Sequence, residues 1–168
     1  MFFLILAAVL TSLDSGTRTE RGQQARRDAL VELREAMGRL TKDLRQAEWI
    51  DPDASTHEKL VMETLVSGER VAVTYRLHPL GSDIYELRRQ EALTPEETIV
   101  TNMVVGTTAN PDPPFCYSFD SAGTPPKCID NGSPPAALTA IRVTMAKDPE
   151  FNPGEPITLA TDVQLRNL

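Results

Sequence analysis

The chain contains few histidines and cysteines, on which acid–base, nucleophilic and metal chemistry often depends, and few aromatic residues. Among its 168 residues are two histidines, two cysteines and only 5% aromatic residues. His57 lies in a polar stretch and His78 precedes Pro79, so we expect both to be solvated residues of loops or turns. No phosphate-binding Gly-rich loop, H-E-x-x-H segment or Ser-His-Asp pattern is present. We therefore predict a non-enzymatic protein that needs no cofactor and no metal.

A surplus of positive charge is also absent. Lysine and arginine total 17 against 24 aspartate and glutamate residues, which gives a formal net charge of −7. Binding to nucleic acid requires a basic surface that faces the phosphates. We therefore expect no nucleic-acid partner, and the acidic balance by itself indicates ordinary solubility.

The chain has no long hydrophobic run. Its most apolar segment, Phe2–Leu13, has 12 residues, whereas a membrane-spanning helix needs about 20. A secretory signal peptide would begin with a basic region, and no basic residue precedes Phe2. We take as a hypothesis that the chain begins late, inside a longer apolar helix.

A helical pattern follows this apolar segment. The polar stretch 14–29 contains Gly16 and Gly22 but no proline, so a helix can continue through it. Beyond it, apolar residues recur at spacings of three and four, which predicts one buried helical stripe. The stripe consists of Leu30, Leu33, Met37, Leu40, Leu44 and Ala47. Arg39 could pair with Asp43 on the helix surface, and Asp51-Pro52 should end the helix.

The rest of the chain alternates between apolar and polar residues, which is typical of half-buried strands. We expect strands within 60–66, 71–77, 85–88, 99–105, 115–119, 141–145 and 157–165. Ser67-Gly68 and the segment from Pro79 to Ser82 should form turns. Short connections favour an antiparallel sheet. The predicted fold class is α+β, with a long N-terminal helix, apolar at its start and amphipathic in its second half, packed on that sheet.

Cys116 and Cys128 flank a proline-rich loop. Seven of the 13 prolines fall between Pro111 and Pro135, so backbone hydrogen bonds cannot hold this segment together. A disulfide across about a dozen residues would stabilise it by roughly 3 kcal/mol and would favour an oxidising compartment. The alternative is a pair of free thiols in a reducing cytosol.

Taken in order, these segments resemble type IV pilin-like proteins, especially minor pilins and the minor pseudopilins of type II secretion systems. The resemblance covers nearly the whole chain, and it depends on the order of motifs that are individually weak. The matching segments are Phe2–Leu13 before Leu-Asp-Ser-Gly at 13–16, Leu40–Ala47, Val73–Leu77 with Tyr85–Arg88, Phe115–Gly123, Ile141–Thr144 and Val163–Asn167.

The resemblance implies a structural subunit of a type IV pilus or a type II secretion pseudopilus. Its head would lie on the periplasmic or extracellular side of the inner membrane, and its N-terminal helix would pack against other pilin-like subunits. The residues of that membrane and assembly helix would be Phe2, Phe3, Leu4, Ile5, Leu6, Val9, Leu10 and Leu13. Cys116 and Cys128 resemble the disulfide-closed C-terminal region of many pilins.

The N-terminal signature of the family is missing from this chain. That signature is a basic leader and a glycine before the cleavage site, then a phenylalanine and, four residues on, a glutamate. Met1–Ile5 aligns with the middle of the family helix instead, so no cleavage or methylation residue is carried over. We divide the chain into a stem with a truncated membrane anchor (1–28) and a pilin-like head (29–168). The alternative interpretation is a membrane-tethered or secreted adhesion module that uses the proline-rich disulfide loop as its contact surface.

Overall fold

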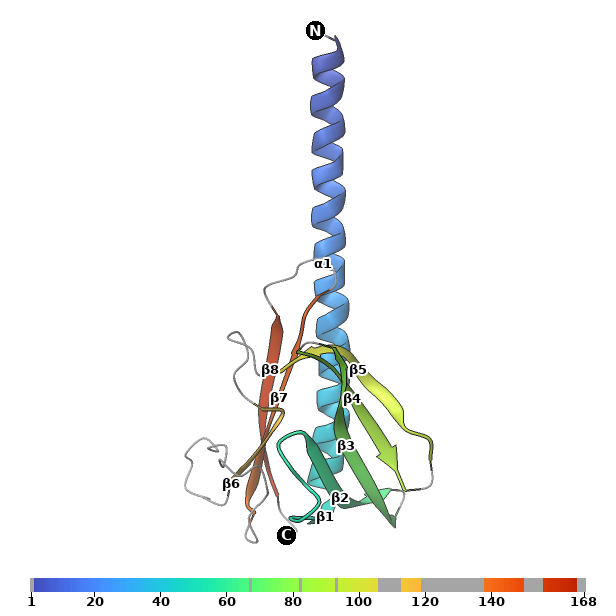
Figure 1. Ribbon diagram of the computed structural model, residues 1–168, viewed down its shortest axis with the longest axis vertical. Helices are drawn as coiled ribbons and strands as arrows, with labels where there is room; N and C mark the ends of the chain where they lie inside the picture. Colours follow the sequence, from blue (N-terminus) through green and yellow to red (C-terminus); the bar gives the residue numbers. More distant parts are fainter. Residues whose placement is uncertain are drawn as a thin grey trace.

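The computed structural model describes residues 2–66, 68–81, 83–92, 94–105, 113–118, 138–149 and 156–165, with side chains from residue 16 onward. Its N-terminal part is one continuous helix of 44 residues, α1 (Phe2–Arg45), half of which extends beyond the head (Figure 1). Gly16 and Gly22 do not interrupt it. The prediction that the helix continues through the polar stretch is therefore confirmed.

In the described part of the chain, eight strands form one antiparallel sheet, which confirms the α+β class. The strands are β1 (Ala47–Ile50), β2 (Lys59–Val66), β3 (Glu69–Gly81), β4 (Ile84–Glu91), β5 (Glu97–Val104), β6 (Phe115–Ser118), β7 (Ala140–Lys147) and β8 (Ile157–Gln164). Their order in the sheet is β1-β2-β3-β4-β5-β7-β6, and β8 pairs with β7. Gly68, at a φ of 89°, makes the expected turn between β2 and β3.

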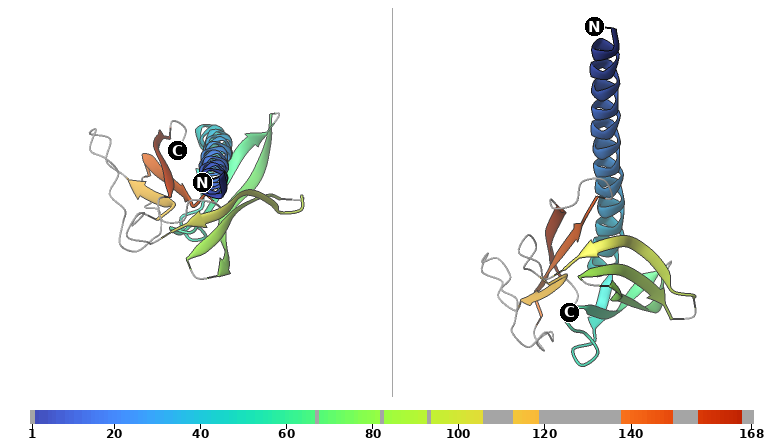
Figure 2. Two further views of the ribbon diagram at one scale, coloured as in Figure 1. Left: turned by 90° about the horizontal axis from the view of Figure 1, so that it is seen from above. Right: turned by 45° about the horizontal axis from the view of Figure 1, so that its top comes forward.

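The sheet curls around the lower part of α1 (Figure 2). Strand β5 pairs with β4 along most of its length and pairs with β7 only at Met103, opposite Lys147. Asn102 there adopts a φ of 52°, and its carbonyl accepts a hydrogen bond from the Asp148 amide. Register shifts between β4 and β5 add local twist. The concave face thus encloses the helix.

The core lies between the inner face of α1 and this concave face. Leu33, Leu40 and Leu44 are fully buried, Met37 packs at the core's edge, and Leu30 is half-buried outside it. Ala29 and Ala36 are also buried on the face of α1 that packs on the sheet. Their small side chains let the helix approach the sheet closely. Sheet residues that complete the core include Leu60, Met62, Tyr75, Leu87, Met103, Phe115, Tyr117, Ile141, Met145 and Val163.

The predicted end of the helix is wrong. Asp51-Pro52 was expected to end it, but α1 ends at Arg45 and Ala47 already belongs to β1. The Gln46 amide closes the last turn by donating to the carbonyls of Lys42 and Asp43. The chain then pairs with β2 instead of making another helical turn, since an extended segment can bury Ala47 and Ile50 against the same core.

The turn predicted from Pro79 to Ser82 is also too long. Strand β3 continues to Gly81, with Pro79 opposite Tyr85 on β4. A register shift between Pro79 and Gly81 accommodates the proline, which cannot donate a backbone hydrogen bond. Ser82 itself lies outside the described residues.

Candidate functional site

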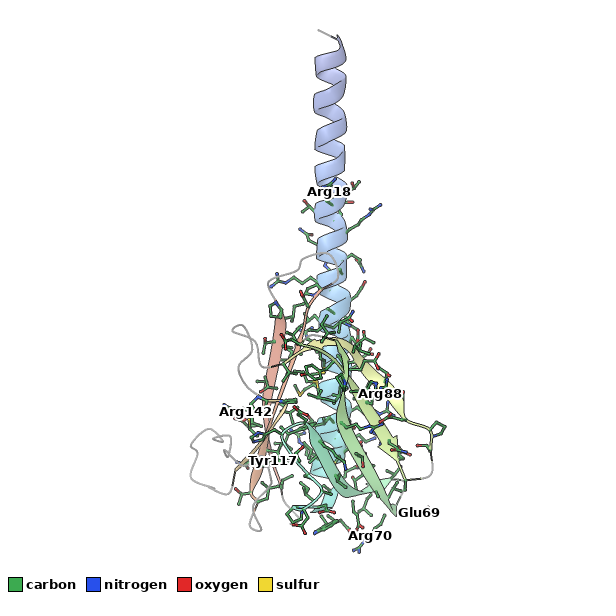
Figure 3. All side chains as sticks on the ribbon, in the orientation of Figure 1. Arg18, Glu69, Arg70, Arg88, Tyr117 and Arg142 are labelled. Atoms are coloured by element: carbon green, nitrogen blue, oxygen red, sulfur yellow. The ribbon has the colours of Figure 1, made fainter. Side chains whose placement is uncertain are left out.

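The stem of α1, residues 2–28, lies outside the head. Between residues 16 and 28 only Gly22 and Ala25 are half-buried, and the other residues are exposed. Side chains near Arg18 stand clear of the head (Figure 3). At 1.5 Å per residue the stem is roughly 40 Å long. The side chains of the predicted assembly residues Phe2, Phe3, Leu4, Ile5, Leu6, Val9, Leu10 and Leu13 lie outside the described ones, although their backbone is helical.

The upper clamp, which we define as Glu32, Thr101 and Lys147, ties α1 to the sheet where the stem meets the head. Lys147 Nζ donates hydrogen bonds to Glu32 Oε2 and, at 3.0 Å, to Thr101 Oγ1. The Thr101 amide donates to Glu32 Oε1 at 2.7 Å. The Lys147 side chain is only 8% exposed. A nearly buried ammonium needs its partner, so this clamp restricts rotation of the helix on the sheet.

The lower clamp, which we define as Asp43, Tyr75 and Arg89, is buried three helical turns further along. The Tyr75 hydroxyl donates to Asp43 Oδ2 at 2.7 Å, and Arg89 Nε donates to the same oxygen at 3.0 Å. The side chains of Arg89 and Asp43 are 6% and 9% exposed. The sequence suggested that Asp43 pairs with Arg39 on the helix surface. That prediction is wrong, because Arg39 instead pairs with Glu97 on β5 at 2.9 Å.

Raising the pH above about 10 should destabilise the head. Burial, with the charge of Asp43, raises the pKa of Tyr75, and burial raises the pKa of Tyr117. Unfolded tyrosine ionises near pH 10, while both folded tyrosines stay protonated. Stability is therefore fully present below pH 10 and falls above it by roughly 1.4 kcal/mol per pH unit for each tyrosine.

Urea unfolding, followed by circular dichroism with tyrosinate absorbance as a second signal, checks this expectation. The unfolding midpoint should fall between mildly alkaline and strongly alkaline buffer, and tyrosinate from these two residues should appear only with unfolding. Tyrosinate from Tyr75 and Tyr117 in a still-folded head would contradict it.

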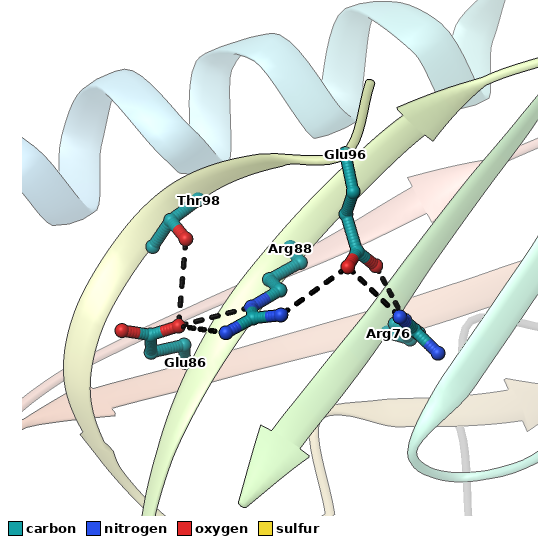
Figure 4. A network of polar contacts seen from close by, with 5 residues as sticks. All are labelled: Arg76, Glu86, Arg88, Glu96 and Thr98. Atoms are coloured by element: carbon teal, nitrogen blue, oxygen red, sulfur yellow. Dashed lines mark hydrogen bonds and ion pairs between the residues drawn. The ribbon is translucent and has the colours of Figure 1, made fainter. Parts of the chain in front are cut away.

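The outer face of the sheet carries a partly exposed charge network (Figure 4). Arg76 on β3 lies directly opposite Arg88 on β4, an arrangement of like charges that is destabilising by itself. Glu96 separates the two charges by accepting from Arg76 and, at 3.3 Å, from Arg88. The hydrogen bond from Arg76 lowers the pKa of Glu96. Sequence patterns did not single out this network. Its charged side chains keep the outer face of the sheet in contact with water.

The histidines differ from the expectation of solvated loop residues. His57 is half-buried and stacks on Tyr117, with ring centroids 6.4 Å apart. Its Nε2 is buried and has no hydrogen-bond partner among the residues that the structure describes. His78 is a half-buried residue of β3 opposite Glu86, not a turn residue. His57 lies in a turn as predicted, but it is half-buried because β6 packs beside it. The turn predicted at His78 was wrong, because pairing with β4 extends β3 over it. Neither effect is local in sequence.

Cys116 lies on β6 and is disulfide-bonded. Cys128, the other cysteine of the chain, lies outside the described residues, as does most of the proline-rich loop that the adhesion interpretation uses as a contact surface. Among the described residues no group of three or more His, Cys, Asp or Glu side chains could hold a metal ion.

Comparison with protein-family models, with curated proteins and with solved structures finds no match for this chain. Within the part of the chain that the structure describes, no helix has both the length and the apolar composition needed to cross a membrane.

Proposed function

We propose that the protein is a non-enzymatic, pilin-like subunit that assembles through its stem into a type IV pilus or a type II secretion pseudopilus. The observation that carries this proposal is the single helix Phe2–Arg45, in which the described side chains are buried in the head only from Ala29 onward. None of the stem side chains that the structure describes, from residue 16 to residue 28, belongs to the core of the head. We therefore infer that this projecting helix makes contacts with something other than its own head.

The composition of the stem supports assembly. Phe2–Leu13 is almost entirely apolar, and each exposed apolar side chain of this size costs about 1.5–3 kcal/mol relative to its burial. Lipid or the apolar helices of neighbouring subunits would cover this surface. We propose that the stem moves between these two environments, with the head on the periplasmic or extracellular side of the inner membrane.

The two clamps support a mechanical role. The upper clamp joins α1 to β5 and β7, and the lower clamp joins it to β3 and β4. Both connect the helix to strands distant in sequence. A pull on the stem is thereby transmitted to the whole sheet, as a filament subunit requires. The disulfide at Cys116 is consistent with an oxidising compartment.

Photo-crosslinking in the native cells tests this proposal. A photoreactive amino acid at Leu6 of the full chain should form adducts with other subunits that carry apolar N-terminal helices. Leu10→Arg should reduce these adducts at least tenfold, because an arginine in an apolar environment costs about 2.5 kcal/mol or more. Gln23→Arg, which adds the same charge at an exposed position of the stem, should leave them unchanged.

Two results would contradict the assembly proposal. One is the absence of any adduct in cells that contain the protein. The other is an adduct pattern that Leu10→Arg and Gln23→Arg affect equally, because the apolar run would then not be the contact.

A further inference from the structure

The outer face of β1, β2 and β3 carries an apolar surface with a carboxylate at its centre. Along β2, Val61, Glu63 and Leu65 alternate with buried residues and therefore point to this outer face. Trp49 of β1 and Ala72 of β3 lie opposite Glu63, one on each side of it. We call these five residues the outer patch.

Trp49 makes the outer patch accessible to an aromatic contact. It is the only tryptophan of the chain, and it is 45% exposed. A register shift between Ala47 and Trp49 marks a bulge in β1, and bulges can turn a side chain in a new direction. In the described sheet β1 is an end strand that pairs only with β2, so no further strand covers the ring.

The carboxylate of Glu63 is unpaired. Among the described residues none forms an ion pair or a hydrogen bond with the Glu63 side chain, whereas Glu48 of β1 pairs with Arg70. Glu63 is also half-buried. A carboxylate between apolar side chains and an open aromatic ring matches the guanidinium of an arginine, which binds carboxylates through two parallel hydrogen bonds and stacks on aromatic rings.

Exposed arginines are concentrated on the stem. The segment 17–27 contains four arginines and one glutamate, in a chain whose net charge is −7, and Arg21 and Arg27 are both exposed. Within one copy the stem cannot reach the outer patch, because β1 and β2 lie at the end of the head away from the N-terminus (Figure 1). The turn at Glu69 and Arg70 marks the same end in Figure 3. The charge complementarity is therefore between different copies.

We propose that the outer patch binds the arginine-rich stem of a second copy of the chain. Glu63 accepts hydrogen bonds from Arg21 or Arg27 of the neighbour, and the same guanidinium stacks on Trp49. This inference rests on the proposed assembly through the stem and adds a second contact to it.

The dimensions of α1 fit this contact. Arg27 and Arg21 lie 18 and 24 residues before Arg45, or roughly 27 and 36 Å along the helix axis. The outer patch begins just beyond the end of α1, at Trp49. A parallel neighbour shifted by about 30 Å along the axis therefore has its outer patch level with these arginines.

The same shift leaves room for both heads. The part of α1 inside the head, Ala29–Arg45, is roughly 25 Å long, so heads shifted by about 30 Å do not overlap along the axis. The stem and the outer patch are different surfaces, and each copy can bind one neighbour through each of them. Such a contact continues from head to stem along a filament instead of closing a dimer.

Photo-crosslinking between differently tagged copies of the full chain in the native cells tests this contact. A photoreactive amino acid at Ala72, an exposed member of the outer patch, should form adducts with residues 16–28 of a second copy, located by mass spectrometry. Glu63→Lys should reduce these adducts at least fivefold. Glu35→Lys, which makes the same charge change at an exposed position of α1 within the head, should leave them unchanged.

A charge exchange separates a lost contact from an unfolded head. Arg21→Glu together with Arg27→Glu should also reduce the adducts at least fivefold. Combining both with Glu63→Lys in one chain should restore at least half of them, because the opposite charges meet again. A head that Glu63→Lys had unfolded would not recover in this way, and the absence of any recovery would overturn the proposal.

The remaining outcomes distinguish this inference from the assembly proposal. Adducts from Leu6 without adducts from Ala72 to a second copy would overturn the contact at the outer patch and leave assembly through the stem in place. Adducts from Ala72 to a different protein would overturn the second copy as the occupant. The absence of adducts from both positions would overturn both proposals.

Discussion

Replacing Asp43 by alanine should lower the free energy of unfolding by about 3 kcal/mol. The Asp43 carboxylate accepts hydrogen bonds from Tyr75 and Arg89 inside the core. Removing it leaves the guanidinium of Arg89, whose side chain is 6% exposed, with Glu91 as its remaining acidic partner. A buried charge that loses a partner retains the cost of its desolvation.

Urea denaturation followed by circular dichroism measures this loss. Arg39→Ala is the matched control, because it also removes an ion pair between α1 and the sheet, but one whose side chains are 41% and 57% exposed. Exposed pairs contribute only about 0–1 kcal/mol. Equal effects of the two substitutions would show that the lower clamp is not a buried pair in solution.

Replacing Leu40 by aspartate should abolish cooperative folding of the head. Leu40 is completely buried in the middle of the core. The substitution loses about 2 kcal/mol of apolar burial and places a carboxylate among buried apolar side chains, which costs several kcal/mol more. A total stability of about 5–15 kcal/mol leaves little after such a loss.

Thermal melting followed by near-ultraviolet circular dichroism reports on this change, because Tyr75 and Tyr117 are fixed in the same core. Val31→Asp provides the control: Val31 lies on the same helix but is 52% exposed, so the head should keep its melting transition. Leu40→Ala should give an intermediate result, a folded head destabilised by about 2–5 kcal/mol. A normal melting transition in Leu40→Asp would mean that the helix is not packed in the curl of the sheet.

Sequence patterns predicted the positions of most strands because each strand has one buried face, and burial imposes a period of two. They failed at the helix end. A helical spacing from Leu44 to Ala47 is also compatible with a chain that leaves the helix and pairs as β1. Nothing within a few residues of Ala47 distinguishes these outcomes. The presence of β2 as a pairing partner decides between them.

The polar contacts of the head were the least predictable part. Asp43 and Arg39 are four residues apart, which suggested a surface pair, but their partners Arg89 and Glu97 lie 46 and 58 positions further along the chain. Local spacing cannot show which of two carboxylates an arginine will meet across a sheet.

The sequence alone determined the long helix, the antiparallel sheet and their amphipathic faces, because apolar periodicity and turn residues act over a few neighbouring positions. The curl of the sheet and the two clamps were decided only by the tertiary structure. They depend on contacts between residues far apart in the chain, whose geometry follows from the way the whole sheet closes around α1.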